Sequence, residues 1–383
     1  MRFPELVYRN IVRRPFRATL TLVALATAMT AIVSLLGISR GFRQAFADVY
    51  TNHAIDIVVS RQGAADRLSS SVAAGMSNQL AALPQVARTA GVLLETISLE
   101  DEGVYGIPTM GLATDSWLVA DYELVGVAPA DRHASPFRAR DGRELLIGEN
   151  LAGRLGLSTG STVSLFTESF RVAGVFRSNS VWENGSLIMP LPVLQRLTGR
   201  DGQVTYINVV LDHESGRPDP TAATRAIEAV DPRLLALPTA EFVKTDTRLK
   251  LADGMAWMTS LVAMVIGGIG TLNTMMTSVH ERTREIGILR AIGWPRQRIM
   301  LMILMESFGL ALAAAVVGSL AAFVLTSLIS RSPAAGGMIA PVINAETLGQ
   351  GLAIALGIGL IGAWLPARRA ARLLPTEAFR EVT

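Results

Sequence analysis

Residue types that commonly carry enzymatic chemistry are sparse in this sequence. A phosphate-binding loop needs a Gly-Lys-Ser/Thr turn to hold the phosphates of ATP. The only lysines are Lys244 and Lys250, and neither stands in such a turn. The pair His280-Glu281 begins like the zinc-binding HExxH motif, yet Arg284 occupies the place of the second histidine. The sequence therefore predicts no ATP hydrolysis of this kind and no zinc-protease site.

Cysteine is absent, which excludes disulfides, thiolate metal sites and a cysteine nucleophile. The sequence has no GxSxG motif, and its four histidines, His53, His133, His213 and His280, are scattered. Such scatter is more typical of surface residues than of a site. We therefore expect no catalytic residue, no metal and no cofactor in this chain.

Four long apolar runs dominate the chain. Residues 18–38 and 255–279 carry no charge, residues 299–330 carry one acid, Glu306, and residues 347–365 are uncharged and glycine-rich. About 20 apolar residues in a helix cross the hydrocarbon core of a bilayer. Hydrophobic residues make up 50% of the chain and the mean hydropathy is +0.38, which is high for a soluble protein. Transmembrane helices are predicted at 18–41, 251–279, 299–330 and 347–365.

The arginines indicate on which side of the membrane each connection lies. Lysine and arginine collect in cytoplasmic flanks. Arginines cluster in residues 1–17, 280–298 and 366–383, whereas the connection 331–346 has one. We therefore predict that both termini are cytoplasmic, with an outer domain at 42–250 and an outer loop at 331–346. The basic clusters are thus assigned to topology and not to nucleic-acid binding.

The residues ahead of the first span have the pattern of a helix on the membrane surface. Phe3, Leu6, Val7 and Ile11 fall on one helical face, with charged residues on the other. We predict an interfacial helix at 1–17 that contacts membrane lipids. The first span should remain uncleaved, because it is longer than the about 7 to 15 apolar residues of a signal peptide.

The charged segment 280–298, called the coupling segment below, lies between the second and third spans. Its sequence is HERTREIGILRAIGWPRQR. Glu281 and Glu285 stand four residues apart beside Arg282 and Arg284, a spacing at which ion pairs stabilise a short helix. A rigid charged helix tied to two spans suits a motor protein that pushes on those spans. A solvated amphipathic loop is the alternative.

The region 42–250 has the patterns of a mixed α/β domain. Gly-rich turns within 141–197 indicate an inserted β-rich subdomain. Alternating and β-branched stretches predict strands at 55–60, 89–100, 162–176, 186–191 and 203–212, and capping signals predict helices at 69–83 and 219–230. The predicted fold class is therefore four transmembrane helices with a large extracytoplasmic α/β domain between helices 1 and 2.

Glu306 is the one acid inside the four apolar runs. It lies about 10 Å into the third span at about 1.5 Å per residue. An ionised carboxylate at that depth is costly, so we expect it to face protein and pair with Arg290, Arg298 or Arg368. Tuning of the helix position and contact with substrate are the alternatives.

Small residues repeat every four positions along the last two spans. Such stripes let helix backbones approach closely, so we expect the two stripes to pack together; lipid-facing alanine is the alternative. The methionines of the second span are assigned to core packing and not to haem binding. The stripes comprise Gly351, Ala355, Gly359 and Ala363 in the fourth span, and Ala314, Gly318 and Ala322 in the third.

These features resemble the MacB/FtsX-type permeases of ABC transporters, a four-span class. The resemblance covers the whole chain, with one span, a large α/β domain and then three clustered spans. The local matches are REIG at 284–287, RAIG at 290–293, Glu306, residues 142–176 and PTEAFR at 375–380. The resemblance implies a multi-pass protein of the bacterial cytoplasmic (inner) membrane.

The resemblance also implies a function and partners. Such a permease exports or extracts an envelope substrate by mechanotransmission from an ABC-type ATPase, which holds the ATP and Mg. Macrolide-type members carry a fused ATPase ahead of the first span, where this chain has only 17 residues, so we expect a separate ATPase subunit. The permease would pair with a second copy of itself or a homologous permease. A periplasmic membrane-fusion adaptor would join where export crosses an envelope.

The coupling segment would contact this ATPase. The resemblance implies that a groove on the ATPase receives the apolar side chains Ile286, Leu289 and Ile292. The helix would end at Trp294-Pro295. The residues expected to take part in coupling are Glu281, Arg282, Arg284, Glu285, Ile286, Leu289, Arg290, Glu377 and Arg380.

Two other functions fit the same features. Cell-division members of the family use ATP-driven motion to activate cell-wall hydrolases, and a membrane sensor would report a ligand bound by its outer domain. The outer domain of the cell-division members is typically smaller than the region 42–250. That difference favours transport over the cell-division function and leaves the sensor as an alternative.

Overall fold

A computed structural model describes residues 15–64, 70–126, 136–137, 142–214, 216, 218–331 and 341–374. Most of the predicted interfacial helix 1–17, most of the outer loop 331–346, and the tail with Glu377 and Arg380 lie outside these residues. The described chain divides into two compact units. Of the described residues, a helical unit takes in 15–40, 252–328 and 341–374, and an α/β unit takes in 41–251 with 329–331.

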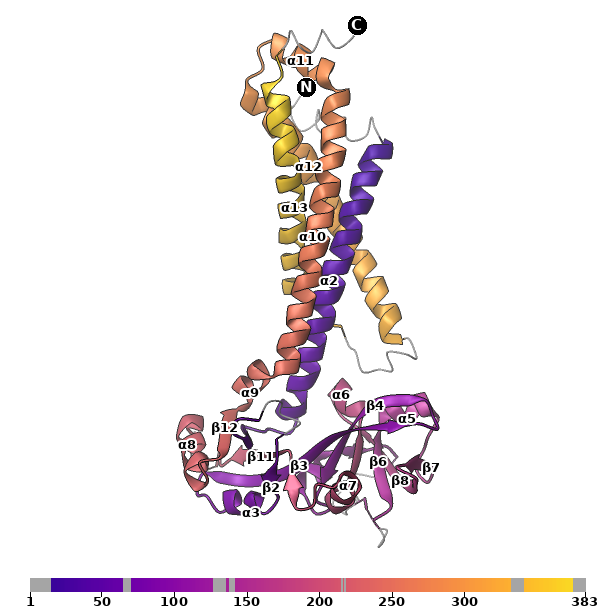
Figure 1. The fold of residues 1–383 in the computed structure, drawn as a ribbon, viewed down its shortest axis with the longest axis vertical. Helices are drawn as coiled ribbons and strands as arrows, with labels where there is room; N and C mark the ends of the chain where they lie inside the picture. The colour runs from indigo at the N-terminus through magenta and orange to yellow at the C-terminus, as the bar shows by residue number, and fades with distance from the viewer. Residues whose placement is uncertain are drawn as a thin grey trace. The chain divides into compact units, whose positions relative to one another are not determined.

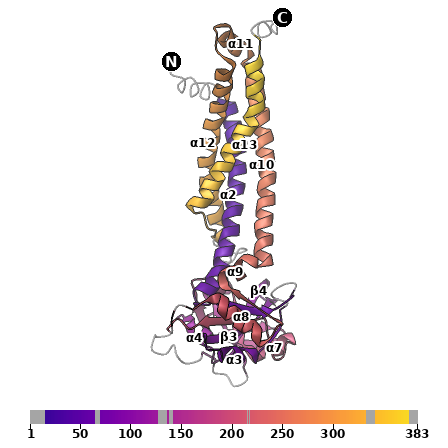
Figure 2. The same ribbon diagram turned by 90° about the vertical axis from the view of Figure 1, so that its left-hand side faces the viewer.

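Within the described residues, four helices are long and apolar enough to cross a membrane. They are α2 (Pro15–Thr51), α10 (Thr247–Glu281), α12 (Arg296–Arg331) and α13 (Ala345–Arg372). Within the helical unit they lie side by side in both views (Figures 1 and 2). Each matches one predicted span and extends beyond it at one or both ends, because polar residues continue the helix past the apolar run.

Helix α2 packs against both small-residue stripes. A Cβ at Gly318 of α12 would lie 2.7 Å from the Ala26 carbonyl oxygen of α2, and one at Gly351 of α13 would lie 2.6 Å from Met29. Ala355 and Ala322 are buried in the same cluster as Met29. The expectation that the two stripes pack on each other is therefore wrong at Gly318 and Gly351, which pack on α2. Helices α12 and α13 contact each other at Gly359, where the Ser307 hydroxyl of α12, which lies outside the stripe, donates to the glycine carbonyl at 2.7 Å.

The remaining members of the stripes are also buried. Ala314 packs with α2 residues such as Leu25 and Ile32, and Ala363 packs with Met275 and Leu310. The methionines of the second span differ in exposure to solvent. Met275 is buried, but Met255 is 70% exposed on α10. Core packing therefore accounts for Met275 and not for Met255.

The close approach at Gly318 yields a first prediction. Gly318→Ala should destabilise the helical unit by about 1–3 kcal/mol, because the new methyl group would collide with the Ala26 carbonyl oxygen and with the inner part of the Met29 side chain. Gly357→Ala on α13 is the matched control, since nothing lies within 4 Å of the Cβ that it adds. Thermal unfolding of the purified chain in detergent measures both. Equal stability of the two variants would contradict the packing.

The α/β unit is built on one mixed sheet. Within the described residues, ten strands form a sheet in the order β12-β1-β11-β3-β4-β9-β6-β8-β5, with β7 paired to β8; β10 and β2 pair separately. The pairs β4–β9 and β6–β8 are parallel and the others are antiparallel. The strands are β1 (Ile57–Arg61), β2 (Val72–Ala73), β3 (Val86–Leu99), β4 (Val104–Leu112), β5 (Glu123–Leu124), β6 (Glu144–Gly148), β7 (Thr162–Leu165), β8 (Glu168–Arg177), β9 (Leu187–Pro190), β10 (Gln203–Val204), β11 (Tyr206–Leu211) and β12 (Leu234–Pro238).

Short helices cover both faces of this sheet. Ile57 and Val59 of β1 pack in one cluster with residues of α3 and α8, whereas Val58 packs in another with residues of α4 and α9. This alternation follows from the two-residue period of a strand. The helices of the unit are α3 (Met76–Ala81), α4 (Trp117–Asp121), α5 (Glu149–Leu155), α6 (Val181–Asn184), α7 (Leu191–Thr198), α8 (Pro220–Val230) and α9 (Thr239–Thr245).

The α/β unit differs from the sequence expectations in three places. The stretch 162–176 is not one strand but the hairpin β7–β8, which turns at Phe166 and Thr167 with positive φ. The helix predicted at 69–83 shortens to α3, because residues 72–73 pair with β10. The segment 141–197 is β-rich, but β9 pairs with β4 and thereby joins it to the common sheet. The helix predicted at 219–230 is confirmed, with Asp219 as its N-cap.

Candidate coupling site

The coupling segment contains a short helix, α11 (Thr283–Ala291), and not one helix over 280–298. Helix α10 ends at Glu281, and the Arg282 carbonyl accepts from the Ile286 N–H at 2.8 Å as α11 begins. At the other end Gly293 has φ +99°, a left-handed conformation that favours glycine. Gly293, and not Trp294-Pro295, therefore ends the helix.

The inner face of α11 is part of the core of the helical unit. Ile286 is 2% exposed and packs with Val279 of α10 and with Ile299 and Ile303 of α12. Leu289 is partly buried against the same cluster. The expectation that Ile286 and Leu289 enter a groove on an ATPase is therefore wrong for Ile286, and Leu289 can offer only part of its side chain.

The outer face of α11 is exposed. Ile288 is 42% exposed and Ile292, just beyond the helix, is 72% exposed. Arg284 and Glu285 are exposed one turn earlier. Because residues three and four apart share a helix face, these side chains form one stripe with an apolar end and a charged end. This stripe, comprising Arg284, Glu285, Ile288 and Ile292, is called the outer stripe below; Glu281, which is also exposed, is the last residue of α10.

Arg282 and Glu306 form a buried ion pair inside the helical unit. The Arg282 Nη1 donates to Glu306 Oε2 at 2.9 Å and to Oε1 at 3.2 Å. Both residues are only 7% exposed. Arg282, expected to contact an ATPase, is therefore too buried to do so. Glu306 faces protein and pairs with an arginine as expected, but none of the three arginines named from the sequence is that partner.

Those three arginines lie elsewhere. Arg290 donates from Nη1 to the Trp294 carbonyl at 2.8 Å and so closes the end of α11. The guanidinium of Arg298 lies 5.0 Å from the centre of the Trp294 ring, which is a cation–π contact. Arg368 is exposed on α13. Arg282 was overlooked because two acids near it in sequence, Glu281 and Glu285, offered ion pairs, whereas Glu306 is more distant in sequence.

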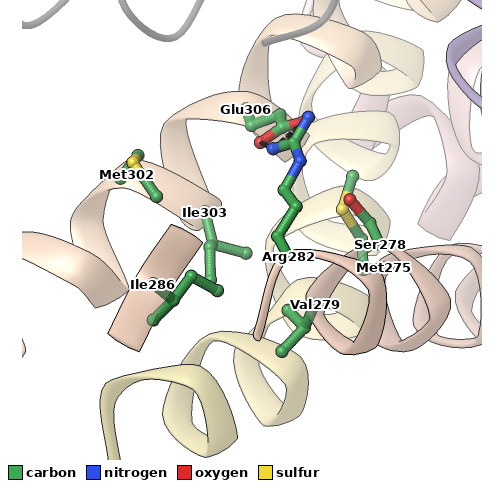
Figure 3. A pocket seen from close by; sticks show the side chains of 8 residues that line it. All are labelled: Met275, Ser278, Val279, Arg282, Ile286, Met302, Ile303 and Glu306. Carbon is green, nitrogen blue, oxygen red and sulfur yellow. Dashed lines mark hydrogen bonds and ion pairs between the residues drawn. The ribbon is translucent and has the colours of Figure 1, made fainter. Parts of the chain in front are cut away.

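A small hollow adjoins the ion pair. Figure 3 shows Arg282 reaching from the end of α10 to Glu306 on α12, with Ile286 and Ile303 nearby. The hollow has room for little more than a water molecule, far less than a ligand site needs. This size argues against contact between Glu306 and a transported substrate. The lining residues are Met275, Ser278, Val279, Arg282, Ile286, Met302, Ile303 and Glu306.

A second polar cluster joins three helices of the helical unit. Arg40 of α2 donates to Glu346 Oε1 at 2.9 Å and to Gln350 Oε1 at 2.8 Å, both on α13. The neighbouring Ser39 donates to Asp253 of α10 at 2.5 Å. The sequence analysis did not find this cluster, although Arg40 lies two residues after the first apolar run and Glu346 directly precedes the fourth.

The described residues thus comprise four apolar helices, an α/β domain between the first two, and a two-faced helix between the second and third. The family model of the MacB-like periplasmic core domain matches residues 18–230, and that of the FtsX-like permease C-terminal region matches residues 257–375. The chain belongs to the family of MacB- and FtsX-like ABC transporter permeases. The predicted resemblance and fold class are confirmed.

Relatives in this family match over nearly the whole chain. The uncharacterized ABC transporter permease YknZ of Bacillus subtilis (strain 168) is 26% identical over 405 residues, which cover 93% of this chain and 96% of that protein. The macrolide export ATP-binding/permease protein MacB of Shewanella oneidensis is 26% identical over 388 residues, which cover 95% of this chain but only 58% of that protein. The chain therefore spans little more than half the length of this MacB relative.

Two solved structures also align with part of the chain. The periplasmic region of MacB from Actinobacillus actinomycetemcomitans aligns with a TM-score of 0.38 and 13% identity over 50% of this chain and 94% of that one. The extracellular domain of YknZ from Gram-positive bacteria aligns with a TM-score of 0.35 and 14% identity over 48% of this chain and 98% of that one.

Proposed function

We propose that this chain is the permease subunit of an ATP-driven transporter that exports or extracts an envelope substrate. A separate ABC-type ATPase would bind ATP and Mg, and its motion would reach the α/β domain mechanically. The two faces of α11 carry this proposal. Ile286 on the inner face is buried among the spans, while Ile288 and Ile292 remain exposed for a partner.

The buried ion pair supports the mechanical role of α11. Because Arg282 directly precedes α11 and binds Glu306 within α12, a force on α11 is transmitted to α12 without depending on a flexible loop. Ile286 adds apolar contacts to α10 and α12. A surface helix held only by solvated side chains could be displaced without moving the spans.

The proposed orientation places α11 in the cytoplasm. The arginines of residues 280–298 and 366–383 favour the cytoplasmic side, and the α/β domain then lies outside. The bacterial inner membrane follows from the family. As partners we propose an ABC-type ATPase, a second permease of the same or a homologous chain, and an adaptor where the substrate crosses an envelope.

Reconstitution tests this function. We expect the purified chain in nanodiscs to hydrolyse no Mg-ATP above the background of empty nanodiscs. An ABC-type ATPase should co-purify from native membranes, and its hydrolysis should change when the chain is added back. Hydrolysis by the chain alone, or the absence of any co-purifying ATPase, would overturn the proposal.

A further inference from the structure

His53 of the α/β unit is buried between two carboxylates. It lies just after the last turn of α2 and is only 5% exposed, so the expectation of a surface histidine is wrong here. Its Nδ1 lies 2.5 Å from Asp121 Oδ2, at the end of α4. Its Nε2 lies 3.2 Å from Glu183 Oε1, on α6. Each ring nitrogen therefore faces a hydrogen-bond acceptor.

With both carboxylates ionised, this arrangement requires a protonated ring. A neutral imidazole carries one N–H and one lone pair, so it can donate to only one of two carboxylates. The lone pair would then face a carboxylate oxygen, which is repulsive. The imidazolium form carries an N–H on both nitrogens and satisfies Asp121 and Glu183 together.

Glu183 depends on His53 for its charge balance. It is fully buried, accepts from the Tyr122 hydroxyl at 2.6 Å, and also accepts from the Ser178 hydroxyl. Burial and the charge of Glu183 raise the pKa of Tyr122, as they do that of nearby Tyr206, so both phenols stay neutral. Among the described residues, His53 is the only basic group paired with Glu183. A buried carboxylate that loses its cation is strongly destabilising.

The cluster fastens the end of α2 to the rest of the α/β unit. The Ser180 hydroxyl, at the start of α6, donates to the Ala45 carbonyl of α2 at 2.7 Å. Phe46 of α2 packs edge-on against Trp182 of α6, with ring centres 6.4 Å apart. The His53–Glu183 contact joins the turn after α2 to the same helix α6. Releasing His53 would thus loosen one connected set of contacts.

We propose that protonated His53 is a latch that holds the last turns of α2 against α4 and α6, and that alkaline pH opens it. A pH change on the side of the membrane that the α/β domain faces would then alter how firmly α2 is anchored in that domain.

The direction of the pH effect follows from the surroundings of His53. Burial by itself lowers the pKa of the imidazole, but the hydrogen bonds and charges of Glu183 and then Asp121 outweigh it and raise the pKa above 6.5. A raised pKa in the folded state means that the stabilisation is fully present below the unfolded pKa and is lost as pH rises through the folded pKa. The latch is therefore closed at acidic pH and opens on alkalinisation.

Hydrogen exchange of the full chain in nanodiscs tests the latch. Protection of residues 41–54 and 178–187, corrected for the intrinsic exchange rate, should fall by up to about tenfold per pH unit between about pH 6.5 and the pKa of folded His53. His53→Gln should give protection that does not depend on pH in this window. His213→Gln is the matched control, because His213 is exposed and bonds only Asp56 among the described residues.

A milder variant keeps the proposal falsifiable if His53→Gln fails to fold. Asp121→Asn removes one of the two negative charges beside His53, at a partly exposed position. The pH at which the loss of protection is half complete should therefore fall by on the order of one pH unit. Protection of the wild type that is flat with pH, a decline that persists in His53→Gln, or an unmoved midpoint in Asp121→Asn would each overturn the latch.

Discussion

Replacing Glu306 by leucine should destabilise the helical unit by about 3–5 kcal/mol, because it leaves the Arg282 guanidinium buried without its carboxylate. Arg282→Met should cost a similar amount by stranding Glu306. The double variant Arg282→Met with Glu306→Leu should recover most of the stability, since apolar groups of similar size replace a buried ion pair at little cost. Thermal unfolding of the purified chain in nanodiscs measures all three.

The arginines that the sequence favoured as partners of Glu306 are the controls. Arg298→Ala and Arg368→Ala should unfold close to the wild-type temperature, because both side chains are exposed. If either substitution costs as much as Arg282→Met, or if the double variant is no more stable than the single ones, the pairing in the structure is not the one that stabilises the protein.

The outer stripe should carry the contact with the ATPase. Ile288→Asp with Ile292→Asp should reduce co-purification of the ATPase at least about tenfold, because it places charge on an apolar anchor at the interface. Stability should hardly change, since both side chains are already exposed. Ile288→Val with Ile292→Val keeps the apolar surface and is the matched control. Ile286→Asp should instead unfold the helical unit, because Ile286 is buried.

The charged end of the outer stripe permits a second test of the same interface. Arg284→Glu with Glu285→Arg should leave the fold intact and weaken binding or ATPase stimulation, because interfacial charges determine register and partner choice. Exposed ion pairs contribute only about 0–1 kcal/mol to stability, so a solvated segment would hardly respond. Normal assembly and activity in both the charge swap and the Asp double variant would show that α11 is not the docking helix.

The sequence alone was sufficient for the features that depend on local composition. A run of apolar residues such as 18–38 must leave water whatever its neighbours are, so the four membrane helices were predicted, and the family models agree with that order of elements. The α/β character of the outer region was likewise predicted from alternation. The start of α8 was predicted from Asp219 and Pro220, because helix capping depends on the residues at the helix end itself.

Only the tertiary structure decided which residues meet. The small residues Gly318 and Gly351 indicated that another helix could approach closely. They did not indicate that this helix is α2. Ile286 and Ile288 differ by two positions, and the orientation of α11 against the spans buries one and exposes the other. Arg282 pairs with Glu306, and His53 with Asp121 and Glu183, across long stretches of chain. A sequence pattern fixes the period of a helix or strand, whereas the choice among equally suitable partners depends on packing in three dimensions.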